Sequence, residues 1–109
     1  MAKEFDGKTA IVTGGTQGLG EAVATHFAGN GASGLIISGR HQQRGESVRE
    51  ALSNNGCKVI FVPADLRLVD ACRDIVRTAR NHFDHVDHLV NCAADTRRGT
   101  IVNTPEELL

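Results

Sequence analysis

Four glycines lie close together near the start of the sequence, with a spacing that suits the binding of phosphate groups. They belong to the segment Thr13-Gly14-Gly15-Thr16-Gln17-Gly18-Leu19-Gly20, which we call the glycine turn. Glycines in such a segment permit a sharp turn after a strand, a close approach of the backbone to a pyrophosphate, and tight packing of a helix on a sheet. Free N–H groups at the start of the helix then meet the phosphates. The segment therefore predicts a dinucleotide site, with a purely structural loop as the alternative.

A second candidate position follows about 20 residues later, where an apolar run ends in Ser38, Gly39 and Arg40. A site for NAD usually carries an acid here, because a carboxylate accepts hydrogen bonds from both ribose hydroxyls and repels a 2′-phosphate. In this sequence Gly39 replaces the acid, and Arg40 supplies a guanidinium that can bind a phosphate through two hydrogen bonds. Ser38 offers another donor. The pattern favours NADP over NAD, and the alternative is that Arg40 is a solvated loop residue.

These positions belong to an alternation of strand-like and helix-like segments. Apolar, β-branched runs predict four strands at residues 9–13, 35–38, 58–62 and 88–91, and their nearly continuous apolar character is typical of a parallel sheet covered on both faces. Between them, apolar residues recur at helical spacing. The recurring residues are Leu19, Val23 and Phe27, then Val48 and Leu52, then Val69, Cys72, Val76, Ala79 and Phe83. The prediction is an α/β fold, a Rossmann-like doubly wound parallel sheet with strand order 3-2-1-4, forming one partial domain over residues 1–109.

The glycine turn resembles that of the short-chain dehydrogenase/reductase family, Thr-Gly-x-x-x-Gly-x-Gly. Asp65-Leu66 is similar to the family's adenine-contacting pair, and residues 87–94 resemble its fourth strand with the motif Asn-Asn-Ala-Gly. Cys92 and Ala94 depart from that motif, while Asn91 can bridge neighbouring strands. The resemblance implies NADP, or alternatively NAD, as a small-molecule cofactor. The implied cofactor-binding residues are Gly14, Thr16, Gln17, Gly18, Leu19, Gly20, Ser38, Arg40, Asp65, Leu66, Asn91, Cys92 and Ala93.

The family's catalytic residues have no match in this sequence. Family members use a Tyr-x-x-x-Lys pair with a serine, in which the tyrosine is the acid/base and the lysine lowers its pKa, and this chain has no tyrosine. The family's catalytic asparagine also falls beyond Leu109. The resemblance therefore implies an NAD(P)-dependent oxidoreductase for carbonyl/alcohol hydride transfer, present here as its cofactor-binding half. A stand-alone nucleotide-binding sensor or partner module is the alternative, and the substrate is not predicted.

Composition and charge disfavour several other functions. The net charge of -1 gives no electrostatic basis for binding nucleic acid or an acidic membrane surface. The apolar runs are strand-sized, far below the roughly 18 residues of a membrane span, and the N-terminus has no signal-peptide core. Cys57, Cys72 and Cys92 are odd in number and widely spaced. They predict reduced core thiols in a cytoplasmic protein.

Two further features lie near the fourth predicted strand. His82, His85 and His88 alternate with acids and suggest a metal site, but they run from a helix end through a turn into a strand, so we expect no shared face and no metal. The strand at residues 88–91 is expected to be an open edge with unpaired N–H and C=O groups. We therefore expect the chain to self-associate there, or further sequence beyond Leu109 to cover that edge.

Overall fold

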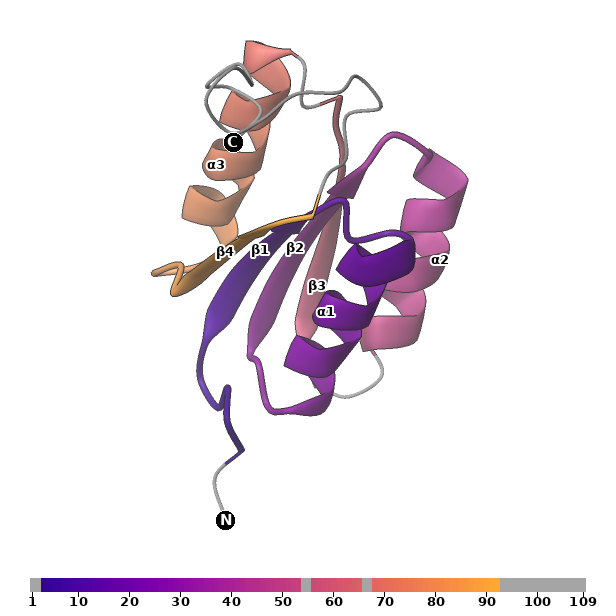
Figure 1. Ribbon diagram of the computed structural model, residues 1–109. Helices are drawn as coiled ribbons and strands as arrows, with labels where there is room; N and C mark the ends of the chain where they lie inside the picture. Colours follow the sequence, from indigo (N-terminus) through magenta and orange to yellow (C-terminus); the bar gives the residue numbers. More distant parts are fainter. Residues whose placement is uncertain (1–2, 54–55, 66–67, 93–109) are drawn as a thin grey trace, which may run out of the picture.

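The structure, a computed structural model, describes residues 3–53, 56–65 and 68–92. Strands and helices alternate over this part of the chain (Figure 1). The elements are β1 (Thr9–Thr13), α1 (Gly18–Gly29), β2 (Gly34–Gly39), α2 (Gln42–Leu52), β3 (Lys58–Pro63), α3 (Val69–His82) and β4 (His88–Asn91). The described strands form one parallel sheet in the order β3-β2-β1-β4. The predicted fold and strand order are thus confirmed.

Helices cover both faces of this sheet (Figure 1). On one face, α1 and α2 pack on strand residues that include Val12, Leu35 and Ile37. On the other, α3 packs through Ile75 and Ala79 on Ile11, Ile36 and Val62. Every residue of β1 is buried, as are the first five of β2. Strands buried on both faces must be apolar at successive positions, which explains the continuous runs in the sequence.

The predicted packing face of α1 is wrong at its first position. Leu19 is 73% exposed, whereas Ala24 and Ala28 are fully or nearly buried. Small residues mark the buried face because α1 approaches the strand end closely at Gly20, where a Cβ would collide with the carbonyl of Gly14. Val23 and Phe27, the other two residues of the predicted spacing, do pack on the core, so only Leu19 at the start of the helix lies outside it.

The predicted packing face of α3 also needs correction. Val69 and Val76 are each 49% exposed, whereas Ile75 and Ala79 are 4% and 3% exposed. Ala71 is partly buried against the same cluster, so the packing face advances in steps of four from residue 71 to residue 79. Apolar residues three or four positions apart occur on both of these faces of α3. Only the position of the sheet determines which face is buried.

None of the three cysteines, all within the described residues, forms a disulfide bond, as predicted. Cys57 is buried, and burial raises the pKa of its thiol to about 11. Cys72 and Cys92 are only partly buried, so the prediction of core positions holds fully for Cys57 alone.

Candidate nucleotide-binding site

The glycine turn connects the carboxyl end of β1 to the start of α1. Gly14 has a φ of 70°, in the left-handed region that favours glycine. A Cβ on Gly20 would collide with the carbonyl of Gly14, so this glycine allows the helix to begin directly against the strand end. Gly18 is the first residue of α1, and Gln17 is its N-cap and is exposed. The start of the helix therefore lies where a phosphate could meet its free N–H groups.

Neighbouring elements hold the turn in place. The N–H of Gly15 donates to the carbonyl of Ser38 at the end of β2, at 3.1 Å. The Nε of Arg44 in α2 donates to the carbonyl of Thr16, at 2.8 Å. Thr16 itself is 4% exposed. The turn is thus fixed by contacts with β2 and α2 as well as by its own glycines.

An open hollow of about 730 Å³ lies beside the turn. Its lining residues come from the N-cap of α1 and from the segment that leads into α2. They are Gln17, Arg40, His41, Gln42, Gln43, Arg44 and Ser47. Two arginines and no acid line it, so the hollow offers an anion two guanidinium groups. The sequence predicts Gln17 and Arg40 as site residues but not Arg44, because the contact of Arg44 with Thr16 joins segments 28 residues apart.

The end of β2 has little room for the acid that an NAD site carries. A Cβ on Gly39 would lie 2.6 Å from Oγ1 of Thr16. An aspartate at position 39 would therefore require Thr16 to move. Ser38 is 1% exposed and is not one of the residues that line the hollow, so its role as a phosphate donor stays a prediction.

The fourth strand supplies a polar link beside the turn. The hydroxyl of Thr13 donates to Oδ1 of Asn91 at 2.7 Å, and the N–H of Cys92 donates to the carbonyl of Thr13 at 3.0 Å. Asn91 thus bridges β4 and β1, as the sequence analysis expects. Asp65 follows β3 and accepts the N–H of Leu68 on its carbonyl, at 2.9 Å.

Some expected site residues do not share the hollow. Leu19 is exposed on the first turn of α1. Leu66 and Ala93 lie outside the described residues, so their assigned roles stay predictions.

Two of the three histidines near β4, His85 and His88, have separate surroundings. Nε2 of His85 lies 3.0 Å from Oδ2 of Asp87, while the ring of His88 packs edge-on against Phe5. No three histidine, cysteine or acidic side chains gather in a metal-binding arrangement among the described residues. The pKa of Asp87 is lowered, mainly because its carboxylate accepts the backbone N–H of Thr9.

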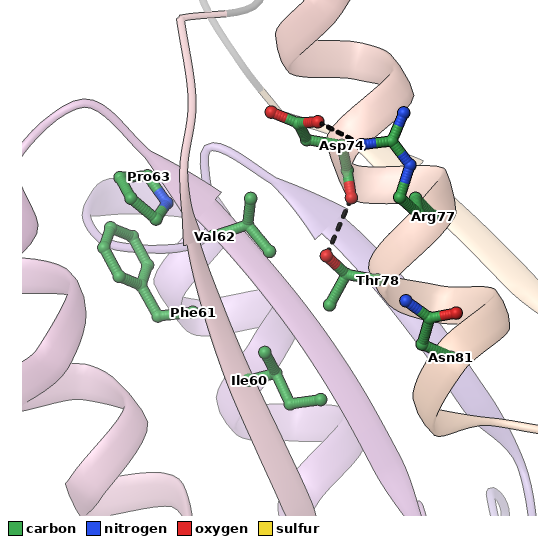
Figure 2. Close-up of a pocket in the computed structure, with 8 residues that line it drawn as sticks. All are labelled: Ile60, Phe61, Val62, Pro63, Asp74, Arg77, Thr78 and Asn81. Carbon is green, nitrogen blue, oxygen red and sulfur yellow. Dashed lines mark hydrogen bonds and ion pairs between the residues drawn. The ribbon is translucent and has the colours of Figure 1, made fainter.

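A second hollow of about 400 Å³ lies between β3 and α3 (Figure 2). Ile60 and Val62 point toward the helix, while Asp74, Arg77 and Thr78 form its polar side. The carboxylate of Asp74 pairs with Arg77 at 3.3 Å, and its carbonyl accepts the hydroxyl of Thr78 at 2.7 Å. Because these polar groups already bond to one another, this hollow has fewer polar groups available to a ligand than the hollow beside the glycine turn.

Comparison with known proteins places this geometry in a family. The model of the short chain dehydrogenase family matches residues 8–108. The chain belongs to that family. A short chain dehydrogenase of Pseudocercospora fijiensis is 39% identical over 105 residues, covering 96% of this chain and 34% of that protein. An uncharacterised oxidoreductase of Bacillus subtilis is 37% identical over 94 residues, covering 86% and 33%.

Solved structures of short-chain dehydrogenases have the same fold. The structure of L-sorbose reductase from Gluconobacter frateurii, complexed with NADPH and L-sorbose, superimposes with a TM-score of 0.81 at 30% identity. It covers 98% of this chain, which in turn covers 41% of that structure. The chain thus spans about a third of the length of the first curated relatives it matches. Among the described residues, no helix has the length and apolar character that crossing a membrane requires.

Proposed function

We propose that this chain is the cofactor-binding portion of an NADP(H)-dependent short-chain dehydrogenase that interconverts carbonyl and alcohol groups. The observation that carries the proposal is Arg40 in an acid-free hollow beside the glycine turn. A 2′-phosphate needs positive charge at this point and the absence of a carboxylate. NAD is the alternative cofactor.

The residues present fit a dinucleotide. The close approach of Gly20 to Gly14 keeps side chains away from the strand end, where a pyrophosphate would meet the first N–H groups of α1. Arg40 would bind the 2′-phosphate on the adenosine ribose. Asn91, which hydrogen-bonds Thr13, would hold the ends of β4 and β1 together beside the nicotinamide half.

The cofactor, when bound, supplies the hydride, and the chain's own residues bind and orient it. Proton transfer to the substrate needs an acid/base group such as the tyrosine that family members use, and this sequence contains no tyrosine. The chain's part in the reaction is therefore cofactor recognition, and the substrate stays open among carbonyl compounds.

Binding measurements test this proposal directly. We expect titration of the chain with NADPH and NADH, followed by amide NMR signals, to shift the signals of Gln17 and Arg40. NADPH should bind about tenfold more tightly, the effect of one hydrogen bond to a charged group at an exposed site. Equal affinities would remove the preference for NADP, and binding of neither cofactor would contradict the proposed function.

The proposal includes three predictions from the sequence: a single partial domain over residues 1–109, a cytoplasmic location, and self-association through β4 or covering of that strand by further sequence. For the last point, Leu89 on β4 is 66% exposed, and among the described strands only β1 pairs with β4. Its other edge would offer unpaired N–H and C=O groups to a second copy of the chain.

A further inference from the structure

Arg44 makes a contact that its position on a helix surface does not require. Its Nε donates to the carbonyl of Thr16, a residue 28 positions earlier in the chain, at 2.8 Å. Arg49, on the same helix, instead donates through Nε to Glu46 within that helix, at 2.8 Å. An exposed arginine usually pairs locally or is solvated. Arg44 instead joins α2 to a buried residue of the glycine turn.

This bond fixes the direction of one peptide in the turn. The described peptides are all trans, and in a planar trans peptide the carbonyl and the following N–H point in opposite directions. The carbonyl of Thr16 is turned to Arg44, so the N–H of Gln17 points to the opposite side. Gln17 is the N-cap of α1 and has no side-chain capping bond. Its peptide therefore sets the orientation of the turn just before the free N–H groups of the helix.

The neighbouring contacts do not fix this peptide by themselves. Gly15 is held by Ser38 on one side, and the N–H of Glu21 donates to the carbonyl of Gln17 at 3.3 Å on the other. The peptide between Thr16 and Gln17 lies between these two bonds, and Gly18, which follows it, has a φ of 58°, in the left-handed region that favours glycine. Arg44 binds the carbonyl of this peptide and so adds a third fixed point to the turn, between the other two.

We propose that Arg44 is a positioning residue for the pyrophosphate, distinct in role from Arg40. Arg44 holds the glycine turn ready for the phosphates shared by NADPH and NADH, whereas Arg40 selects the 2′-phosphate found only in NADPH. Both line the same hollow, but only Arg44 hydrogen-bonds the turn. This inference rests on the proposed function for its ligand, while the effect of Arg44 on the turn can be measured without one.

The first test uses the chain without cofactor. We expect Arg44→Ala to speed amide hydrogen exchange at Gly15 and Glu21, whose bonds lie on either side of Thr16, by about tenfold, the equivalent of one hydrogen bond to a charged group. Arg44→Lys keeps a donor and should restore most of the protection. Arg49→Ala, the matched control, should leave both amides unchanged. Unchanged exchange in Arg44→Ala would overturn the inference whatever the chain binds.

The second test measures NADPH and NADH dissociation constants for the same variants. Arg44→Ala should weaken both cofactors by the same factor, and Arg40→Ala should weaken NADPH alone. A selective loss of NADPH in Arg44→Ala would make Arg44 a second phosphate ligand and overturn its positioning role. If the unsubstituted chain binds neither cofactor, the proposed function fails, and the exchange data alone decide whether Arg44 orders the turn. Arg44→Lys supplies the comparison if Arg44→Ala does not fold.

Discussion

The double substitution Gly39→Asp with Arg40→Leu is expected to move the cofactor preference from NADPH toward NADH. Arg40 lines the hollow beside the glycine turn and is exposed to solvent. Losing a hydrogen bond from a charged donor costs about 1.5–3 kcal/mol, and solvent exposure places Arg40 near the lower end of that range. Since about 1.4 kcal/mol corresponds to a factor of ten, NADPH affinity should fall about tenfold.

The aspartate brings a second, steric effect, because Thr16 occupies the space beside Gly39. A Cβ at position 39 would lie 2.6 Å from Oγ1 and 3.1 Å from Cγ2 of Thr16. Thr16 is 4% exposed and has little room to move away. The double variant should therefore lose about 1–3 kcal/mol in free energy of unfolding, the usual cost of overpacking. Adding Thr16→Ala should recover most of that loss.

Two measurements on one set of variants separate these effects. NMR titrations give the dissociation constants for NADPH and NADH, and urea unfolding gives the free energy of unfolding. Gly39→Ala is the matched control: it adds the Cβ and no charge, so it should lose stability and keep its cofactor preference. If the triple variant, with Thr16→Ala, binds the two cofactors in the same ratio as the unsubstituted chain, the reasoning is refuted and Arg40 is not part of the site.

Three further changes test the surrounding structure. Gly20→Ala should lower the free energy of unfolding by about 1–3 kcal/mol, measured in urea, because its Cβ would meet the carbonyl of Gly14; an unaffected variant would contradict the close approach of α1 to β1. Asp87 has a pKa below its ordinary 3.8, chiefly because it accepts the Thr9 N–H, so its stabilisation is present above about pH 4 and is lost as the pH falls through the lowered folded-state pKa. Urea titrations should show this acid loss in the unsubstituted chain and a smaller one in Asp87→Asn. Leu89→Lys should reduce self-association in sedimentation at micromolar concentration; a chain that is already monomeric would contradict pairing through β4.

The fold could be predicted because its signals are local and repeated. Each buried strand has a continuous apolar run, and the glycine turn marks the junction between the first strand and helix. The run at residues 35–38 identifies β2 but misses its two terminal glycines, Gly34 and Gly39. Glycine carries no hydrophobic signal, and only pairing with neighbouring strands, such as Gly34 with Lys58 and Gly39 with Pro63, places both residues in the sheet.

The features that the sequence did not predict, the contact of Arg44 and the buried face of α3, depend on packing between segments that are distant in the chain. Arg44 reaches Thr16 only after α2 has packed beside the glycine turn, and its own sequence neighbourhood is that of an ordinary solvated helix. Likewise, the choice between Ile75 and Val76 on α3 depends on where the sheet lies, because both fit a helical spacing. The spacing of apolar residues predicts that a helix is present, and tertiary packing determines which of its faces is buried.

Contacts among three elements, β1, β2 and α2, form the site. β1 ends in the glycine turn, β2 ends beside it at Gly39, and α2 returns Arg44 to the carbonyl of Thr16. The residues that would bind the phosphates and those that hold the turn therefore come from one stretch of chain, between positions 13 and 47. Cofactor selection and turn geometry are coupled through Thr16, which contacts Arg44 through its carbonyl and limits position 39 through its side chain. An acid at the end of β2 therefore also strains Thr16, so adding Thr16→Ala to Gly39→Asp and Arg40→Leu should combine the changed cofactor preference with most of the original stability.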